Sequence, residues 1–209
     1  MTSIKTRLEQ GIDAMGCTLS SEAIERMSEF VALLHKWNRA YNLTAVRDPD
    51  QMVSRHVLDS LSVLPWLQGP GLLDVGSGAG IPGILLAIAR PELQVTLLDG
   101  NGKKVRFQQH ACRTLGLENV EPVHERLEQY HPERGFDQII SRAFSTLSQF
   151  TETSQHLLAA DGEWLAMKGR LDSEPDALPS GIELIETIEL NVPNESGQRH
   201  LIRARQLSA

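Results

Sequence analysis

The sequence LLDVGSGAGIPG, from Leu72 to Gly83, decides how the rest of this chain is interpreted. Apolar residues lead into Asp74, glycines follow at positions 76, 78, 80 and 83, and another apolar run begins at Ile84. This order predicts a buried strand, a tight glycine turn and a helix whose N-terminus points back at the turn. Because glycines let a ligand approach the backbone closely, we expect a nucleotide-like ligand at this turn.

Three interpretations of the turn compete. Residues 78–83, GAGIPG, match the dinucleotide pattern GxGxxG and would predict an NAD site. A dinucleotide site, however, places a pyrophosphate at the helix N-terminus, and the carboxylate of Asp74 just before the turn would repel phosphate. S-adenosylmethionine suits that carboxylate better, because it carries a sulfonium and an ammonium and no phosphate. The third interpretation is a strand–turn–helix corner without a ligand, in which Asp74 only caps the helix.

Composition indicates a soluble globular protein, since 41% of the 209 residues are hydrophobic and 22% are charged. No apolar run approaches the roughly 20 residues of a membrane span, and the first residues turn polar at once, unlike a signal peptide. Cys17 and Cys112 stand alone, without the neighbouring cysteine that a metal knuckle or a redox pair needs. We therefore expect a cytoplasmic protein without a metal site, and a monomer, because no segment suggests an obligate partner.

The formal charge of −7 argues mildly against a nucleic-acid binder, although net charge describes solubility and steering more than local sites. The cations nevertheless cluster along the chain. These clusters predict either an RNA-binding face or ordinary solvated faces of helices and strands. They are Lys103, Lys104 and Arg106; Arg142; Lys168 and Arg170; and Arg199, Arg203 and Arg205.

Residues 1–68 are predicted to form an all-helical lead-in packed on a catalytic domain of residues 69–209, because their apolar residues recur at spacings of three and four. His56 and Asp59, three residues apart, should share a face of the last of these helices. They are interpreted as a buried histidine satisfied by a carboxylate, with a role in a ligand site as the alternative. The expected helices span about residues 3–15, 20–38 and 48–65.

From Gly71 onward strands and helices alternate, which predicts a parallel sheet with crossover helices. The last two strands are predicted to form an antiparallel hairpin around residues 193–197. The expected fold class is therefore α/β: a class I S-adenosylmethionine-dependent methyltransferase with a Rossmann-like, mostly parallel seven-stranded sheet and a C-terminal antiparallel hairpin, preceded by the N-terminal helical segment. The expected strands are 71–75, 94–98, 120–123, 136–140, 162–167, 182–190 and 200–204, and the helices between them are 81–90, 102–115, a short one through 127, and 146–159.

Four charged residues end predicted strands, where an open parallel sheet binds its ligand. Asp74, Asp99, Arg142 and Lys168 therefore define the expected site. Asp99 can accept hydrogen bonds from ribose hydroxyls, which does not distinguish NAD from S-adenosylmethionine because both contain a ribose. The segment from Glu118 to Val120 and the turn from Glu125 to Leu127 are expected to bracket the adenine through backbone contacts.

The residues after the fourth expected strand, Ser141 to Phe144, narrow the methyl acceptor. Amino-group methylation usually places an Asn/Asp-Pro-Pro-aromatic turn there, and ribose methylation typically needs an acid where this chain has Arg142. Carbon methylation of a pyrimidine needs a cysteine nucleophile, and neither cysteine lies at a strand end. The remaining acceptor is a nitrogen with a free lone pair, such as N7 of guanine, which needs no general base and is methylated mainly through alignment.

Basic and aromatic residues at the strand ends would hold the base. A bidentate arginine on O6 and N7 would block the methylated atom, so we expect Arg142 to hold O6 or the RNA backbone. Lys168 is expected to hold a phosphate or O6. Phe144 is interpreted either as a stacking platform for the base or as core packing. Arg142 has an alternative interpretation too, an ion pair with Asp74 or Asp99.

Five separated blocks of the chain resemble the RsmG (GidB) family, the bacterial methyltransferases that make 7-methylguanosine at guanosine 527 of 16S ribosomal RNA. The resemblance implies the class I fold, S-adenosylmethionine as the donor, and the small ribosomal subunit or its RNA as the substrate. The blocks are WNRAYNLT (37–44), RHVLDSL (55–61), LLDVGSGAGIPGI (72–84), SRAF (141–144) and MKG (167–169).

The motif matches, together with the strand-end argument, assign expected roles to single residues. Gly76, Gly78 and the nearby backbone would hold the methionine part, Asp99 the ribose, and Arg126 would lie at the adenine end. The residues expected to bind the donor are Asp74, Gly76, Ser77, Gly78, Gly80, Asp99, Glu125, Arg126 and Arg142. The residues expected to bind RNA are Lys103, Lys104, Arg142, Phe144, Lys168 and Arg199, of which Arg142 and Lys168 are expected to be catalytic.

Two other classes of function remain as alternatives. The first is a non-catalytic RNA-binding or ribosome-associated module that keeps the same fold. Loss of the acidic strand ends or of the glycines would favour it, and this sequence has kept both features. The other is an NAD-dependent oxidoreductase, which would be stabilised by nicotinamide nucleotides rather than by methyl-donor nucleotides.

Overall fold

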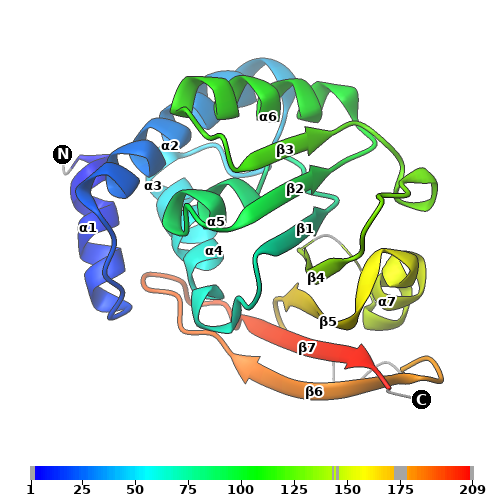
Figure 1. Cartoon of the computed structure of the whole chain (residues 1–209). Coiled ribbons are helices and arrows are strands. Elements are labelled where there is room, and N and C mark those ends of the chain that lie inside the picture. The colour runs from blue at the N-terminus through cyan, green and yellow to red at the C-terminus, as the bar shows by residue number, and fades with distance from the viewer. Residues whose placement is uncertain (1–2, 143, 145, 172–177, 208–209) are drawn as a thin grey trace.

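The computed structural model describes residues 3–142, 144, 146–171 and 178–207, and a seven-stranded sheet forms its centre. The strands lie in the order β3-β2-β1-β4-β5-β7-β6 (Figure 1). The first five of these run parallel, whereas β7 lies antiparallel between β5 and β6. The expected mostly parallel sheet with a C-terminal antiparallel hairpin is confirmed. The strands are β1 Gly71–Val75, β2 Gln94–Leu98, β3 Val120–Val123, β4 Phe136–Ser141, β5 Leu158–Lys168, β6 Ile182–Glu189 and β7 His200–Gln206.

The helices cover the two faces of the sheet unequally (Figure 1). The N-terminal helices, α5 and α6 pack against one face in the larger hydrophobic core, whereas α7 packs against the other face in a smaller one. The helices are α1 Ile4–Ala14, α2 Ser21–Tyr41, α3 Pro49–Met52, η1 Val53–Leu58, α4 Asp59–Leu61, η2 Leu64–Trp66, α5 Gly83–Ala89, α6 Gly102–Leu115, η3 Leu127–Gln129, α7 Leu147–Ser154 and η4 Gln155–Leu157.

Strand β1 separates the two cores and orients the first candidate site residue. Leu72 packs in the larger core, and Leu73 packs in the smaller core that contains Phe150 of α7. Successive side chains of a strand point to opposite faces, so Asp74 points to the same face as Leu72. That face carries α5, and this alternation explains why Asp74 meets the start of that helix.

The helix from α3 to α4 carries a π-helical segment, η1, in its middle. Asp48 caps its start by accepting a hydrogen bond from the backbone N–H of Asp50 at 3.0 Å. Wider i→i+5 bonding in a π segment shifts the residues that follow to a different side of the helix, and such segments are frequent at functional sites. The segment contains Arg55 and His56, and Asp59 follows it directly.

Several element boundaries differ from the expected ones, and at two of them contacts distant in sequence are the reason. Helix α2 continues past residue 38 to Tyr41, and the buried side chain of Asn38 binds the connector through Val46 and Thr44. Strand β5 begins at Leu158 rather than at residue 162, because Leu158 pairs with Phe136 before a register shift in β4. Tertiary pairing here overrides the turn-like sequence around Asp161 and Gly162.

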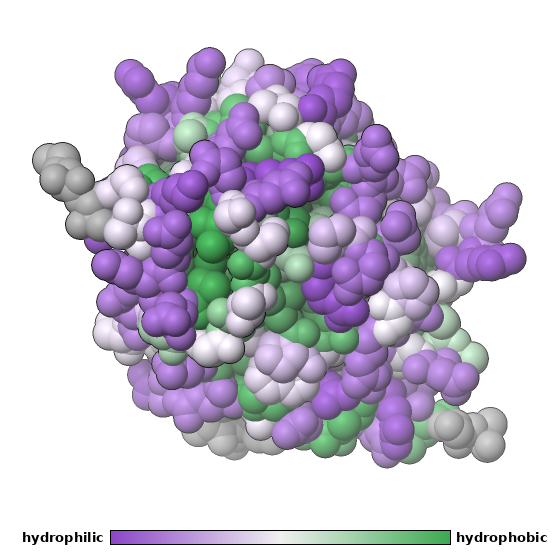
Figure 2. All heavy atoms as spheres, turned by 60° about the vertical axis from the view of Figure 1, so that its left-hand side comes forward, coloured by the Kyte–Doolittle hydropathy of each residue, from purple (hydrophilic) through white to green (hydrophobic). Residues whose placement is uncertain are grey.

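The surface beside the N-terminal helices is hollowed, and apolar side chains lie in the hollow with polar side chains around it (Figure 2). Four large apolar side chains among the described residues are more than a third exposed, and they lie far apart in the sequence. Within the described part of the chain, no helix is both long and apolar enough to cross a membrane.

Candidate functional site

The glycine turn after β1 is held against the neighbouring strand by its own backbone. The N–H groups of Gly76 and Ser77 donate to the carbonyl oxygen of Leu98 at 2.9 and 3.2 Å. Gly76, Gly78 and Gly80 have φ values of 66°, 60° and 76°, in the left-handed region that favours glycine. The turn therefore presents a fixed backbone with little side chain above it, as a close-fitting ligand requires.

Asp99, at the end of β2, braces this turn with both carboxylate oxygens. Oδ2 accepts a hydrogen bond from the N–H of Gly78 at 2.8 Å, and Oδ1 accepts one from the N–H of Asn101 at 2.8 Å. The ammonium of Lys104 lies 3.9 Å from Oδ2. Because a carboxylate has about four lone-pair sites, Asp99 keeps capacity for two further donors such as ribose hydroxyls.

A cavity of about 400 Å³ opens beside this turn, and we call it the glycine-turn cavity. It is lined, among others, by Gly76, Asp99, Gly100, Glu125, Arg126 and Phe144. Four residues that the sequence assigns to the donor thus meet around one space. The ring of Phe144 lies 5.2 Å from that of Phe150, so the side chain packs on the smaller core and forms a wall of this cavity.

Asp74 is buried under α5, with an exposed fraction of 1%, and it does not line the glycine-turn cavity. Its Oδ2 accepts a hydrogen bond from the N–H of Gly83 at 2.8 Å, which is the helix-cap interpretation of this residue. Burial raises the pKa of Asp74 to about 7, and the hydrogen bond from Gly83 opposes that rise. The other oxygen, Oδ1, is buried without a hydrogen-bond partner among the described residues.

Ser77 and Gly80 lie behind the turn rather than in the glycine-turn cavity. Ser77 is buried and donates to the carbonyl of Leu98 at 3.3 Å, and a Cβ on Gly80 would lie 2.4 Å from Ile84 Cδ1. Gln108 of α6, which the sequence analysis missed, donates from Nε2 to Ser77 Oγ at 2.9 Å and to the carbonyl of Gly78 at 2.8 Å. The only sequence signal was a polar residue on the inward face of an amphipathic helix.

A second, smaller cavity of about 130 Å³ lies where the ends of β4 and β5 meet the start of β7, and we call it the arginine cavity. Its charged and polar lining residues are Asp59, Arg142, Lys168, Arg199 and His200. The structure thus brings together three of the five cations that the sequence analysis assigns to RNA binding or catalysis. Lys168 Nζ donates to the carbonyl of Phe144 at 2.8 Å, so this hydrogen bond joins one lining residue of each cavity.

Asp59 of the arginine cavity was expected to pair with His56, with a role in a ligand site as the alternative. Its Oδ2 accepts from Nη1 of Arg142 at 3.2 Å, and its Oδ1 accepts from Nε of Arg199 at 3.1 Å. The alternative pairing of Arg142 with Asp74 or Asp99 is therefore wrong. Burial raises the pKa of Asp59, and the guanidinium groups of Arg142 and Arg199 oppose this rise.

The expected pairing of His56 with Asp59 is also wrong. Nε2 of His56 lies 2.9 Å from Oγ1 of Thr44, and Nδ1 lies 3.0 Å from the carbonyl oxygen of Arg55. The expectation assumed α-helical spacing, but His56 lies in the π-helical segment, where residues three apart no longer stack along one face. Burial, and next the charge of Arg142, lower the pKa of His56 to about 4, so its imidazole is neutral at pH 7.

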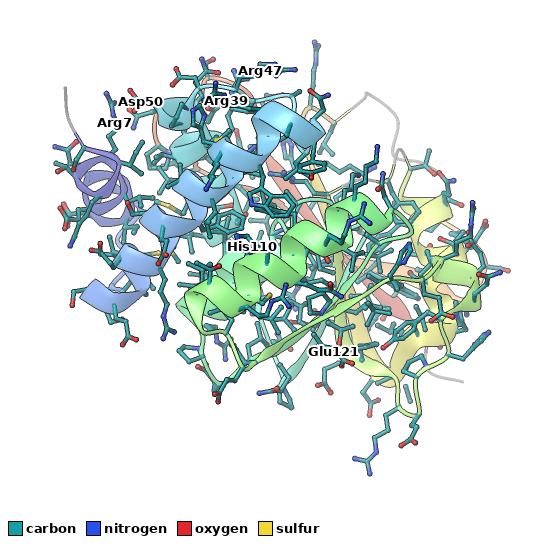
Figure 3. All side chains as sticks on the ribbon, turned by 90° about the horizontal axis from the view of Figure 1, so that it is seen from above. Arg7, Arg39, Arg47, Asp50, His110 and Glu121 are labelled. Carbon is teal, nitrogen blue, oxygen red and sulfur yellow. The ribbon has the colours of Figure 1, made fainter. Side chains whose placement is uncertain are left out.

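The two expected RNA-binding lysines lie outside both cavities. Lys103 and Lys104 occupy the first turn of α6, where Lys103 is exposed and Lys104 faces Asp99. Helix α6 lies beside α2 (Figure 3), and the ring of His110 lies 5.0 Å from that of Trp37.

Ala143, part of the SRAF block, lies outside the described residues. Over the described ranges, no cluster of three or more histidine, cysteine or acidic side chains could hold a metal ion.

Comparison with known sequences gives matches along nearly the whole chain. The family model "rRNA small subunit methyltransferase G" matches residues 23–202. A protein named ribosomal RNA small subunit methyltransferase G from Chromohalobacter salexigens is 57% identical over 203 residues, covering 97% of both chains. A protein of the same name from Pseudomonas syringae pv. syringae is 52% identical over 200 residues, covering 95% of this chain and 94% of its own.

Comparison with solved structures concerns the fold. A SAM-dependent methyltransferase from Aquifex aeolicus superimposes with a TM-score of 0.60 at 19% identity, covering 79% of this chain and 97% of its own. A SAM-dependent methyltransferase from Thiobacillus denitrificans, solved with S-adenosyl-L-homocysteine, superimposes with a TM-score of 0.52 at 13% identity, covering 72% of this chain and 90% of its own. These likenesses establish the class I methyltransferase fold.

Proposed function

Since this chain belongs to the rRNA small subunit methyltransferase G family, we propose that it transfers a methyl group from S-adenosylmethionine to N7 of guanosine 527 in 16S ribosomal RNA. Membership of this family supports the general activity, which is S-adenosylmethionine-dependent methylation of small-subunit ribosomal RNA. The identity of the nucleotide and of its methylated atom is the proposal, and it rests on the chemistry of the two cavities.

One arrangement carries the proposal: a cavity suited to a nucleoside adjoins a cavity lined by three cations. Gly76 and Asp99 line the first cavity, and Arg142, Lys168 and Arg199 line the second. Lys168, which lines the second cavity, donates from Nζ to the carbonyl of Phe144, which lines the first. A methyl donor in the first and a guanine of RNA in the second would be held next to each other.

The residues at the glycine turn suit S-adenosylmethionine better than a dinucleotide. The N–H of Gly83, which would face a pyrophosphate, already donates to Asp74. Asp74 also has a buried oxygen, Oδ1, without a donor among the described residues, and an ammonium group could satisfy it. Asp99 retains lone pairs for hydroxyl groups beside the turn. These residues fit the donor that the family uses.

When bound, S-adenosylmethionine supplies an electrophilic methyl group on a positively charged sulfur. Guanine N7 has a free lone pair that would accept this methyl group, and the positive charge of the donor would pass to the base. No proton has to be removed at any stage. The contribution of the protein is therefore alignment, which can supply several kcal/mol of barrier lowering.

The cations of the arginine cavity would hold the base and its phosphates. Arg142 donates to guanine O6 or to a phosphate and leaves N7 open, whereas Lys168 donates to a phosphate or to O6. Arg199, on the other side of Asp59, extends the cationic lining toward the RNA strand. We retain Phe144 as a wall of the neighbouring cavity, because its ring packs on Phe150.

The same lining argues against acceptors that need a base or a nucleophile. The carboxylate that lines the arginine cavity, Asp59, is engaged by two guanidinium groups and is poorly placed to accept a proton. Cys112 is buried in α6, and burial raises the pKa of its thiol to about 11. Nitrogen N7, which needs neither group, agrees with this lining.

Mass mapping of small-subunit RNA tests the proposal directly. RNA from cells with and without this protein is digested, and the methylated nucleotide is identified by mass and by its chemical reactivity as 7-methylguanosine. We expect one methyl group, at guanosine 527, that is lost with the protein and restored by adding the purified chain and S-adenosylmethionine. Parallel reactions with naked RNA and with small subunits identify the substrate. A methyl group at another atom or nucleotide would refute the proposal.

The assembly proposed with this function is a cytoplasmic monomer in which the helical lead-in, residues 1–68, packs on the catalytic domain, residues 69–209. The larger core supports this packing, because Leu8 and Met27 of the lead-in share it with Leu86 of α5. Light scattering of the purified chain should give the mass of a single chain, and a dimer mass would contradict this part of the proposal.

A further inference from the structure

A buried carboxylate from the helical lead-in lies between two guanidinium groups of the arginine cavity. Asp59 is 3% exposed and accepts hydrogen bonds from Arg142 at 3.2 Å and from Arg199 at 3.1 Å. Arg142 Nη1 also donates to the carbonyl of Arg55 at 3.1 Å. One helix thus provides both acceptors for Arg142 and joins it to Arg199, although the two arginines are far apart in the sequence.

A second acid continues the same network. Glu195, on the loop between β6 and β7, accepts from Ser54 Oγ at 2.7 Å and lies 3.5 Å from Nη2 of Arg199 and 3.4 Å from Nε of Arg55. The side chain of Glu195 is only 10% exposed. Arg199 is therefore paired with two acids, Asp59 and Glu195.

The charge balance of the cavity explains why a carboxylate is needed there. Three cations line it, and the proposed methyl transfer places a further positive charge on the base. Like charges a few ångströms apart in a partly buried site repel one another, because little water screens them. Asp59 is the acid among the described lining residues, so it offsets this repulsion where the charge develops.

We propose that Asp59 is a positioning residue that orients the guanidinium groups of Arg142 and Arg199 for methyl transfer. This inference rests on the proposed function, because it concerns the same reaction. It also makes the helical lead-in a part of the site, since Asp59 lies in α4 and its network partners Ser54 and Arg55 lie in the π-helical segment. The alternative is that Asp59 only ties the lead-in to the sheet.

Asp59→Asn tests the proposal with little change of shape. Asparagine can accept from one guanidinium through Oδ1 but presents an NH₂ group to the other, so the two arginines should lose their common orientation. With the full chain and its RNA substrate, we expect single-turnover methyl transfer to fall about 100-fold, the loss typical of a misplaced site. S-adenosylmethionine affinity should stay within about twofold. RNA affinity should not weaken, and its salt dependence should steepen, because one negative charge is removed.

Glu163→Gln is the matched control. Glu163 of β5 accepts three hydrogen bonds from Arg203 of β7, and both side chains are mostly buried. Neither residue lines the glycine-turn or the arginine cavity. We expect the control to lower the melting temperature and to leave the transfer rate unchanged. Loss of transfer without loss of RNA affinity should thus be specific to Asp59.

Asp59→Glu covers the case in which the asparagine variant does not fold. It keeps the charge but moves the carboxylate by one methylene, and we expect it to fold and to transfer methyl groups at least about tenfold more slowly. Parent-like transfer by the glutamate variant, or by a folded asparagine variant, would overturn the proposal. The proposal would also be overturned if Asp59→Asn and Glu163→Gln both lost methyl transfer in the same proportion to their drop in melting temperature. A parent chain that does not methylate small-subunit RNA would instead refute the proposed function.

Discussion

The carboxylate of Asp74 accepts a hydrogen bond from the backbone N–H of Gly83, with 2.8 Å between Oδ2 and the nitrogen. This contact joins the end of β1 to the start of α5 across the glycine turn. It places a carboxylate where a dinucleotide-binding chain would place a phosphate. The pattern GAGIPG in residues 78–83 therefore has the letters of a dinucleotide motif without its free helix terminus.

Asp74→Asn should weaken S-adenosylmethionine binding and remove its pH dependence around neutrality. Burial raises the pKa of Asp74 to about 7, so this carboxyl is protonated below that pH and charged above it. The charged form attracts a cation, and affinity in the parent should therefore increase as the pH rises through about 7. Calorimetric titration from about pH 5.5 to 8.5 measures this dependence.

Asp137→Asn is the control for that titration, because Asp137 also accepts from a backbone N–H, that of Gly71, but at the other end of β1. It should bind the donor with the pH dependence of the parent. A parent whose affinity is flat over this range would show that Asp74 does not contact the cation. Binding of NAD by the Asp74 variant would reopen the dinucleotide interpretation.

Asp99→Ala should lower S-adenosylmethionine affinity roughly 10- to 100-fold, because hydrogen bonds to a charged group are worth about 1.5–3 kcal/mol. Two effects combine, namely the loss of ribose contacts and the release of Gly78, whose N–H binds Asp99. Isothermal calorimetry at constant pH measures the affinity. Unchanged affinity in a folded variant would remove Asp99 from the donor site.

Arg142→Ala should keep donor affinity within about twofold and reduce methyl transfer by at least about 100-fold, since the arginine orients the base. Arg205→Ala removes an exposed arginine that pairs with Glu183 on the hairpin and should transfer at the parent rate. Single-turnover reactions followed by filter binding of the labelled RNA compare the methyl-transfer rates of the Arg142 and Arg205 variants. Equal rates in both variants would place Arg142 outside the reaction.

His56→Gln should make the protein more resistant to acid. Burial lowers the folded-state pKa of His56 from 6.5 to about 4, so the stability that this neutral histidine contributes is complete above about pH 6.5 and is lost as the pH falls through about 4. The loss is roughly 3 kcal/mol over that window. Urea unfolding at several pH values should show a smaller loss in the glutamine variant.

His156→Gln serves as the comparison for this measurement, because His156 is exposed, with Nε2 lying 3.2 Å from the carbonyl oxygen of Tyr130. Its acid unfolding should follow that of the parent. If the His56 and His156 variants lose stability equally as the pH falls, burial of His56 is not a source of the acid sensitivity.

Local rules of the chain were enough for the order of the elements and for the glycine turn. Strands β1, β2 and β3 have their predicted bounds, and Ser20 caps α2 through the N–H of Ala23. These features depend on side-chain periodicity, on left-handed glycines and on caps, all of which act over a few residues. The start of β5 was mispredicted, because its pairing with Phe136 depends on another strand.

The sequence by itself determined the α/β fold and the strand ends where the site lies, because both follow from short-range pattern and from the geometry of parallel sheets. Only the tertiary structure decided which charges meet. Asp59 binds Arg142 and Arg199, which are 83 and 140 residues away along the chain. Such pairing depends on the π-helical turn before Asp59 and on the packing of that helix beside the sheet, and no local pattern encodes either distance.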